Sequence, residues 1–172
     1  MSRAIIINLL RFIVLVFIQV FLLKNIDVYG LSTPYLYILF ILLLPFNIPN
    51  ILLFILAFIL GITVDMFYDT PGLHTAVCII LAFVRILFIS ITVQKEGFDN
   101  EPEPTLSIMG FRWFFTYAVT LTIIHHFFLF NLEAFSLSQI EFTISRVLLS
   151  SLFTVFLMLI SGLLFFKRKE RK

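Results

Sequence analysis

The chain has 172 residues, of which 61% are hydrophobic and 13% are charged, and its mean hydropathy is +1.11. This composition excludes a self-contained soluble active site, because almost no sequence is left to form a domain outside a bilayer. The formal net charge is only +2, and we expect no nucleic-acid partner. The single cysteine, Cys78, excludes an intramolecular disulfide and a cysteine-based metal site.

Apolar blocks separated by short turns fill the chain, and each block predicts a membrane-spanning helix. A hydrocarbon core about 30 Å thick takes roughly 20 apolar residues per helical crossing. In chain order, the predicted helices cover residues 5–23, 31–46, 51–66, 73–93, 111–131 and 142–166. A polar loop at 94–110 and a basic tail at 167–172 complete a single integral membrane domain. The sequence therefore predicts an all-α, polytopic membrane protein with six transmembrane helices.

The second block is short, since a helix over 31–46 is only about 24 Å long at the helical rise of about 1.5 Å per residue. Pro34 lies in its first turn and Pro45 near its end. Blocks two and three could instead form a re-entrant hairpin, which leaves four full crossings. Both arrangements place the two termini on the same side of the membrane. We favour six crossings, because block three carries no charge before Asp65.

The positive-inside rule assigns an orientation to the predicted helices. Five basic residues lie in the tail at 167–172, and Arg3, Lys95 and Arg112 lie on the same side as the tail. On the opposite side Lys24 is the only basic residue. Both termini are therefore predicted to be cytoplasmic, where we interpret the tail as a topology anchor. Binding of anionic membrane lipid by the tail is the alternative.

Ionisable side chains at membrane depth are costly, so each one requires an explanation. The direction and rise of the predicted helices sort these side chains into two layers. The outer layer combines a carboxylate with imidazole and guanidinium groups: Asp65, His74, His125, His126 and Arg146. The inner layer is purely basic: Arg11, Arg85 and Arg112. We expect Arg85 to be satisfied by backbone carbonyls, by water or by an anionic partner.

We interpret the outer layer as a structural network that ties predicted helices three to six together, with Asp65 and Glu141 as counter-ions. A metal site is the first alternative, but adjacent histidines on a helix point about 100° apart, and no His-x3-His pair occurs. A proton relay is the second, but no carboxylate lies near the predicted midplane. We therefore expect no metal and no other cofactor.

Small residues at a spacing of four indicate where helices approach closely. Three pairs at this spacing are Ala57 and Gly61, Thr116 and Thr120, and Ser150 and Thr154. We expect most such pairs to pack the chain's own helices and one or two to face a partner. No Gly-x-Ser-x-Gly, paired catalytic carboxylates or His-Glu-x2-His occurs. The sequence therefore predicts no enzymatic activity and no catalytic residue.

The segment from Gly61 to His74 (Gly-Ile-Thr-Val-Asp-Met-Phe-Tyr-Asp-Thr-Pro-Gly-Leu-His) goes beyond composition. A glycine near a helix end, an aspartate four residues later and a glycine that resumes an apolar helix resemble the signature region of the MreD family of rod shape-determining membrane proteins. Three further features resemble the family: the turn at 25–27 that leads to Pro34-Tyr35-Leu36-Tyr37, the start of block five at Arg112-Trp113-Phe114, and the later His125-His126 pair.

The resemblance implies a non-enzymatic subunit of the cell elongation complex in the bacterial cytoplasmic (inner) membrane. Such a subunit acts in cell shape and peptidoglycan synthesis by associating with the bitopic protein MreC. Through MreC it contacts the MreB filament, the glycosyltransferase RodA and its penicillin-binding transpeptidase. The resemblance also implies a fold similar to the six-helix substrate-binding (S) components of ECF vitamin transporters. Gly61, Asp65 and Gly72 fall on the family's recurrent turn, where they are expected to allow close packing, to cap or pair, and to turn the chain.

Two other functions remain open. The first is a ligand-binding subunit of an ECF-type vitamin transporter; short external loops and the lack of an Ala-x3-Ala pattern in block one argue against it. The second is a lipid-handling protein with an anionic headgroup at Arg85.

Overall fold

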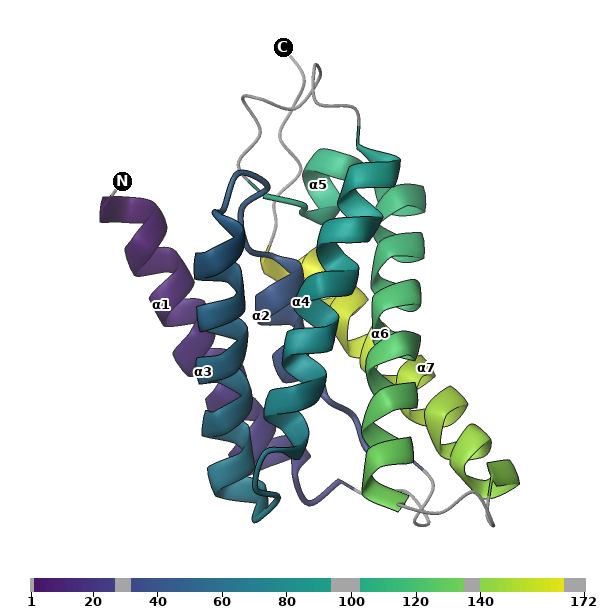
Figure 1. The fold of residues 1–172 in the computed structure, drawn as a ribbon. Helices are drawn as coiled ribbons and strands as arrows, with labels where there is room; N and C mark the ends of the chain where they lie inside the picture. The colour runs from purple at the N-terminus through teal and green to yellow at the C-terminus, as the bar shows by residue number, and fades with distance from the viewer. Residues whose placement is uncertain (1, 27–31, 94–102, 135–139, 166–172) are drawn as a thin grey trace.

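The computed structural model describes residues 2–26, 32–93, 103–134 and 140–165, and every regular element among them is a helix (Figure 1). The long helices are α1 (Ser2–Phe17), which continues as the π-helix η1 (Ile18–Leu23), α3 (Asn50–Tyr68), α4 (Leu73–Thr92), α6 (Phe111–Ala134) and α7 (Ile140–Phe165). The short helices are the 3₁₀ helix η2 (Leu36–Ile38), α2 (Leu39–Leu42) and α5 (Leu106–Met109).

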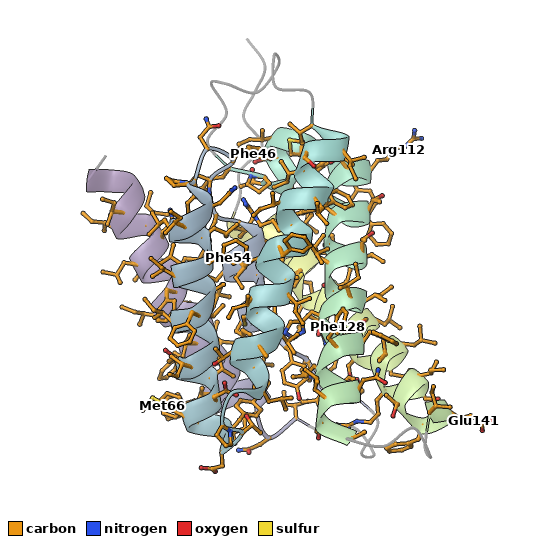
Figure 2. All side chains as sticks on the ribbon, in the orientation of Figure 1. Phe46, Phe54, Met66, Arg112, Phe128 and Glu141 are labelled. Atoms are coloured by element: carbon orange, nitrogen blue, oxygen red, sulfur yellow. The ribbon has the colours of Figure 1, made fainter. Side chains whose placement is uncertain are left out.

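Among the described residues, five helices are long and apolar enough to cross a membrane, as in a multi-pass membrane protein: Ile5–Leu23, Asn50–Tyr68, Leu73–Thr92, Phe111–Ala134 and Ile140–Leu163. These spans confirm five of the six predicted helices to within a few residues at each end. Large apolar side chains project outward all along them (Figure 2). Such a surface suits hydrocarbon and would be unfavourable in water.

The helix predicted over 31–46 is wrong, because helical structure in the described part of this block, from residue 32 on, is confined to Leu36–Leu42. Pro34 lacks an N–H donor and disfavours helical geometry in the residue before it, so the block begins as irregular backbone. The seven helical residues rise only about 10 Å, far less than a membrane crossing requires. The alternative of a re-entrant hairpin is not required, since α3 alone is long and apolar enough to span.

Residues 32–45, which we call the central segment, lie inside the bundle. Nearly every side chain from Tyr35 to Leu44 is buried, and α2 packs against α1, α3 and α4 while η2 contacts α7. Figure 1 shows α2 in the middle of the molecule, behind α3 and α4. Irregular backbone is tolerated at membrane depth only where protein surrounds it. The central segment therefore depends on its neighbours for the hydrogen bonds that its own helix does not provide.

The polar loop predicted at 94–110 is described only from residue 103, where it contains the short helix α5. This helix lies at the end of the bundle where α1 begins (Figure 1), and the side chain of Leu106 packs against Gly162 of α7. The predicted basic tail at 167–172 lies outside the described residues.

Candidate functional site

Asp65 joins the end of α3 to the beginning of α4. Its Oδ1 accepts hydrogen bonds from the backbone N–H of His74 at 2.9 Å and from the Thr70 hydroxyl at 3.0 Å. Its Oδ2 accepts from the backbone N–H and the hydroxyl of Thr75, at 2.9 Å and 2.6 Å. The buried carboxylate thus satisfies two of the free N–H groups in the first turn of α4, where the helix dipole favours a negative charge.

The two glycines of this turn have separate structural reasons. A Cβ atom on Gly61 would lie 2.4 Å from the Cα of Thr75, so only glycine lets α3 and α4 approach this closely. Gly72 has a φ of +87°, in the left-handed region that glycine adopts without strain. The expected roles of Gly61 in packing, Asp65 in capping and Gly72 in turning are all found here.

The Tyr37 hydroxyl bridges two of the predicted histidines inside the bundle. Its oxygen lies 2.9 Å from Nδ1 of His74 on α4 and 2.9 Å from Nε2 of His125 on α6. A hydroxyl carries one proton, so Tyr37 donates to one ring and accepts an N–H from the other. Nδ1 of His125 is buried without a hydrogen-bond partner among the described residues.

His126 lies in a second chain of hydrogen bonds, which links α6 to α7. Its Nδ1 is 2.8 Å from the carbonyl oxygen of Thr122, so this nitrogen carries the proton of the neutral ring. Its Nε2 is 3.2 Å from the hydroxyl of Thr154, which also accepts the backbone N–H of Tyr35 at 3.0 Å. Thr154 therefore donates to His126, and the chain of bonds ends on the central segment.

Other side chains bind the irregular backbone at the first half of the central segment. The Gln19 amide nitrogen donates to the carbonyl oxygen of Pro34 at 3.1 Å, and its amide oxygen accepts from the N–H of Tyr37 at 3.4 Å. The Ser150 hydroxyl accepts from the N–H of Thr33 at 3.0 Å. Our sequence reasoning missed Gln19, although it is one of only two side-chain amides within the first apolar block, the other being Asn8.

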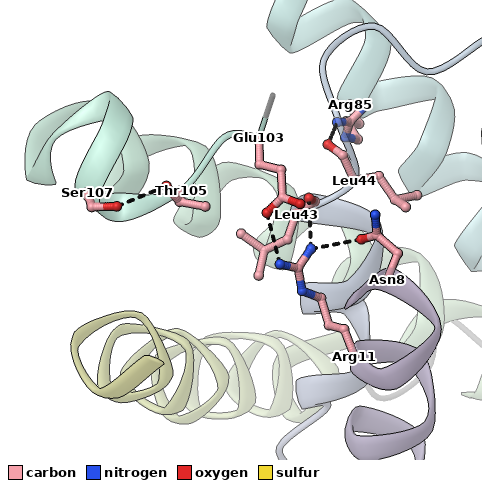
Figure 3. A network of polar contacts seen from close by, with 8 residues as sticks. All are labelled: Asn8, Arg11, Leu43, Leu44, Arg85, Glu103, Thr105 and Ser107. Carbon is pink, nitrogen blue, oxygen red and sulfur yellow. Dashed lines mark hydrogen bonds and ion pairs between the residues drawn. The ribbon is translucent and has the colours of Figure 1, made fainter. Parts of the chain in front are cut away.

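The carbonyl groups at the other end of the central segment have no helical partners and are bound by three side chains from three helices. The Tyr117 hydroxyl donates to the oxygen of Leu42 at 3.0 Å, and Arg11 Nη1 donates to that of Leu43 at 3.2 Å. Arg85 Nη2 donates to the oxygen of Leu44 (Figure 3). The same nitrogen donates to the oxygen of Pro45 at 3.2 Å. Cations at the carboxyl end of a helix are also favoured by its dipole.

Arg11 has further partners around the same point. Its Nη1 donates to Oδ1 of Asn8 at 3.0 Å, and its Nη2 pairs with Oε2 of Glu103 at 2.9 Å (Figure 3). Neither Glu103 nor this ion pair was predicted, because the sequence indicated only a polar loop at 94–110 and no contact between that loop and the first helix.

The structure brings together some of the predicted site residues and separates others. Asp65 binds the backbone of His74, and the Tyr37 hydroxyl joins His74 to His125. Arg85 binds backbone carbonyls, which is one of the three kinds of partner expected for it. Arg146 instead pairs with Glu133 at 3.3 Å and lies over the ring of Phe130, so neither Asp65 nor Glu141 is the counter-ion found. Arg112 is exposed at the beginning of α6 and points away from the bundle (Figure 2).

Two of the three small-residue pairs face the protein's own interior. Gly61 meets Thr75 of α4, and Ser150 and Thr154 bind the central segment. The Thr116 hydroxyl is exposed and donates to the carbonyl oxygen of Arg112 in its own helix.

Most of the buried polar side chains described above bind backbone groups. Within the described ranges, no group of three His, Cys, Asp or Glu side chains is placed to hold a metal ion. The polar side chains at membrane depth instead replace the hydrogen bonds that an unbroken second helix would have made for itself. No family model, no curated protein and no solved structure matches this chain.

Proposed function

We propose that this protein is a non-enzymatic membrane scaffold of the bacterial cell-wall elongation (rod) complex, acting in cell shape and peptidoglycan synthesis in the manner of MreD. The use of its buried polar groups supports this proposal. Asp65, Arg11, Arg85 and Tyr117 are all engaged with backbone groups of the protein itself. Side chains occupied in this way hold a shape, and the apolar outer faces are left to meet other proteins in the membrane.

In this proposal the scaffold lies in the bacterial cytoplasmic membrane with both termini in the cytoplasm. It binds a bitopic protein of the MreC kind and, through it, positions a RodA-type glycosyltransferase, its penicillin-binding transpeptidase and the MreB filament. The central segment takes the place of the second of six crossings, as in the S components of ECF transporters, although it is not a spanning helix and much of its backbone is irregular. Its burial, and the contact of Tyr35 with Tyr68 at the end of α3, support this place.

The first experiment is to extract the tagged full chain from its native membrane in mild detergent and to identify the proteins that co-purify. The proposal expects a bitopic periplasmic protein, together with glycosyltransferase or penicillin-binding partners. Recovery of a transporter ATPase pair, or of a tightly held vitamin, would replace it with the alternative of a ligand-binding transporter subunit.

A photo-reactive amino acid placed on α6 tests whether an outer face meets the partner. Phe115 is 41% exposed, whereas the adjacent Phe114 is 1% exposed and serves as the matched control. Scanning exposed positions on α1, α6 and α7 in the same way should yield a cross-link to the bitopic partner from at least one face. A cross-link from Phe114 alone, or from none of the exposed positions, would count against a scaffold that acts through its outer faces.

A further inference from the structure

A groove of about 320 Å³ opens on the outside of the bundle between α1 and α7. Leu36 and Leu39 of the central segment lie in its lining, Leu10 and Val14 contribute from α1, and Ser161 contributes from α7. Leu10 and Val14 are also exposed on the outer surface, so the groove is open toward the lipid. Its lining is apolar except for Ser161 and one charged side chain.

That charged side chain is Arg11, which lines the groove beside Leu43. Arg11 shares the neighbourhood with Arg85, which binds the next carbonyl along the central segment, and with Glu103 (Figure 3). Two guanidinium groups and one carboxylate give these three side chains a net positive charge. An anion at this place is therefore complementary to the protein.

The size of the groove restricts what can fill it. A cavity of roughly 150 Å³ accommodates a benzene ring, so 320 Å³ holds about a dozen carbon atoms. One turn of a helix with its side chains, about 10 Å across and 5.4 Å long, already takes about 400 Å³. The groove is thus too small for a partner helix to enter, and it suits most of one alkyl chain.

We propose that this groove holds an acyl chain of an anionic phospholipid, with the phosphate beside Arg11. A guanidinium can bind phosphate oxygens through two parallel N–H bonds. At Arg11 the phosphate competes with Glu103 for the Nη2 donor, while Nη1 stays bound to Asn8 and Leu43. The lipid would also support the least enclosed span of the bundle. Only 22% of the α1 span is buried inside the protein, against 33% to 50% of the other four. In this proposal the acyl chain of the lipid covers the side of α1 that faces α7.

The test uses the purified full chain, stripped of lipid in detergent, and native mass spectrometry with added phosphatidylglycerol or phosphatidylcholine. We expect one retained phosphatidylglycerol, bound about fivefold more tightly than phosphatidylcholine, because one basic side chain near the membrane surface contributes about 1 kcal/mol toward an anionic headgroup. Equal retention of the two lipids would overturn the proposal.

Two neighbouring leucines provide a matched pair of variants. Leu10 lines the groove and Leu9 does not, although both are exposed to a similar extent, 60% and 58%. Leu10→Trp should fill the groove and lose the retained lipid, whereas Leu9→Trp should keep it. Equal retention in the two variants would overturn the proposal. A second result would also overturn the proposal: a wild-type chain that retains no lipid, forms a dimer, and loses that dimer on Leu10→Trp. In that case a second copy of the chain, and not a lipid, would cover the groove.

Charge variants test the place of the headgroup. Glu103→Gln removes the competing carboxylate and should increase retention of phosphatidylglycerol, while leaving that of phosphatidylcholine unchanged. Unchanged retention of both lipids would contradict the position beside Arg11. These measurements use the isolated chain, so their failure leaves the co-purification test of the scaffold function unaffected, and the converse also holds.

Discussion

Replacing Gly61 by alanine tests the close contact between α3 and α4. The added Cβ would lie 2.4 Å from the Cα and 2.8 Å from the backbone nitrogen of Thr75. Both are backbone atoms of a helix, so no side-chain rotation can relieve the overlap. The two helices would have to separate by about 1 Å, from 2.4 Å to the 3.4 Å of an ordinary contact.

The same separation would break bonds to the Asp65 carboxylate. Its Oδ2 now accepts from the hydroxyl and the N–H of Thr75 at 2.6 Å and 2.9 Å, and an added 1 Å takes both beyond hydrogen-bonding range. Overpacking costs roughly 1–3 kcal/mol, and a hydrogen bond to a charged group contributes about 1.5–3 kcal/mol. We therefore expect Gly61→Ala to lower the free energy of unfolding by about 3 kcal/mol or more.

The assay is the midpoint of SDS-induced unfolding of the purified chain in mixed micelles. Gly162→Ala is the matched control, since a Cβ there would meet only the flexible side chain of Leu106, at 3.4 Å. Alanine is favoured over glycine within a helix by about 1 kcal/mol, so this control should leave stability unchanged or raise it slightly. Equal midpoints for the two alanine variants would refute the reasoning from close packing.

Three further predictions concern the polar side chains. Asp65→Ala leaves the first turn of α4 without the carboxylate that accepts its N–H groups. We therefore expect the amount of protein in the membrane, measured by immunoblot, to fall severalfold. Normal abundance together with failed partner binding would instead place Asp65 at an interface. Tyr117→Phe removes the donor to the carbonyl oxygen of Leu42 with little change of shape, so the unfolding midpoint in SDS should correspond to a loss of about 1–3 kcal/mol; an unchanged midpoint would contradict that role. Arg85→Gln should lower the free energy of unfolding by about 3 kcal/mol in the same assay, because Arg85 is buried. Arg112→Gln, at an exposed position, should change the free energy of unfolding by less than about 0.5 kcal/mol. Similar losses of stability in the two variants would contradict the structural role of Arg85.

Local features of the sequence were sufficient to predict five spans and one turn. A run of about twenty apolar residues specifies a helix in a bilayer regardless of its neighbours, because only a helix or a closed barrel satisfies the backbone there. The turn from Gly61 to Gly72 is also local, since Asp65 reaches amide groups only nine and ten residues away. Its expected structural role could therefore be inferred without knowing how the other helices pack.

Block two could not be predicted in this way. Its apolar composition is that of a spanning helix, and Pro34 and Pro45 indicate only that helical structure is interrupted near each end. Whether the interrupted backbone lies at the surface or in the centre depends on what surrounds it. The central position is fixed by hydrogen bonds from Gln19, Arg11 and Arg85. These residues are separated from their partners in the block by 15, 32 and 41 residues of sequence.

The sequence by itself thus determined that the protein is helical and apolar enough for a membrane, and where most helices begin and end. Only the tertiary structure decided the task of each polar side chain at membrane depth. Arg146 pairs with Glu133 rather than Asp65, and Thr154 reaches the backbone of Tyr35 across 119 residues of sequence. Hydrophobic burial is nonspecific and can be read from composition, but a hydrogen bond requires two particular atoms within about 3 Å, and only the packed helices bring those atoms together.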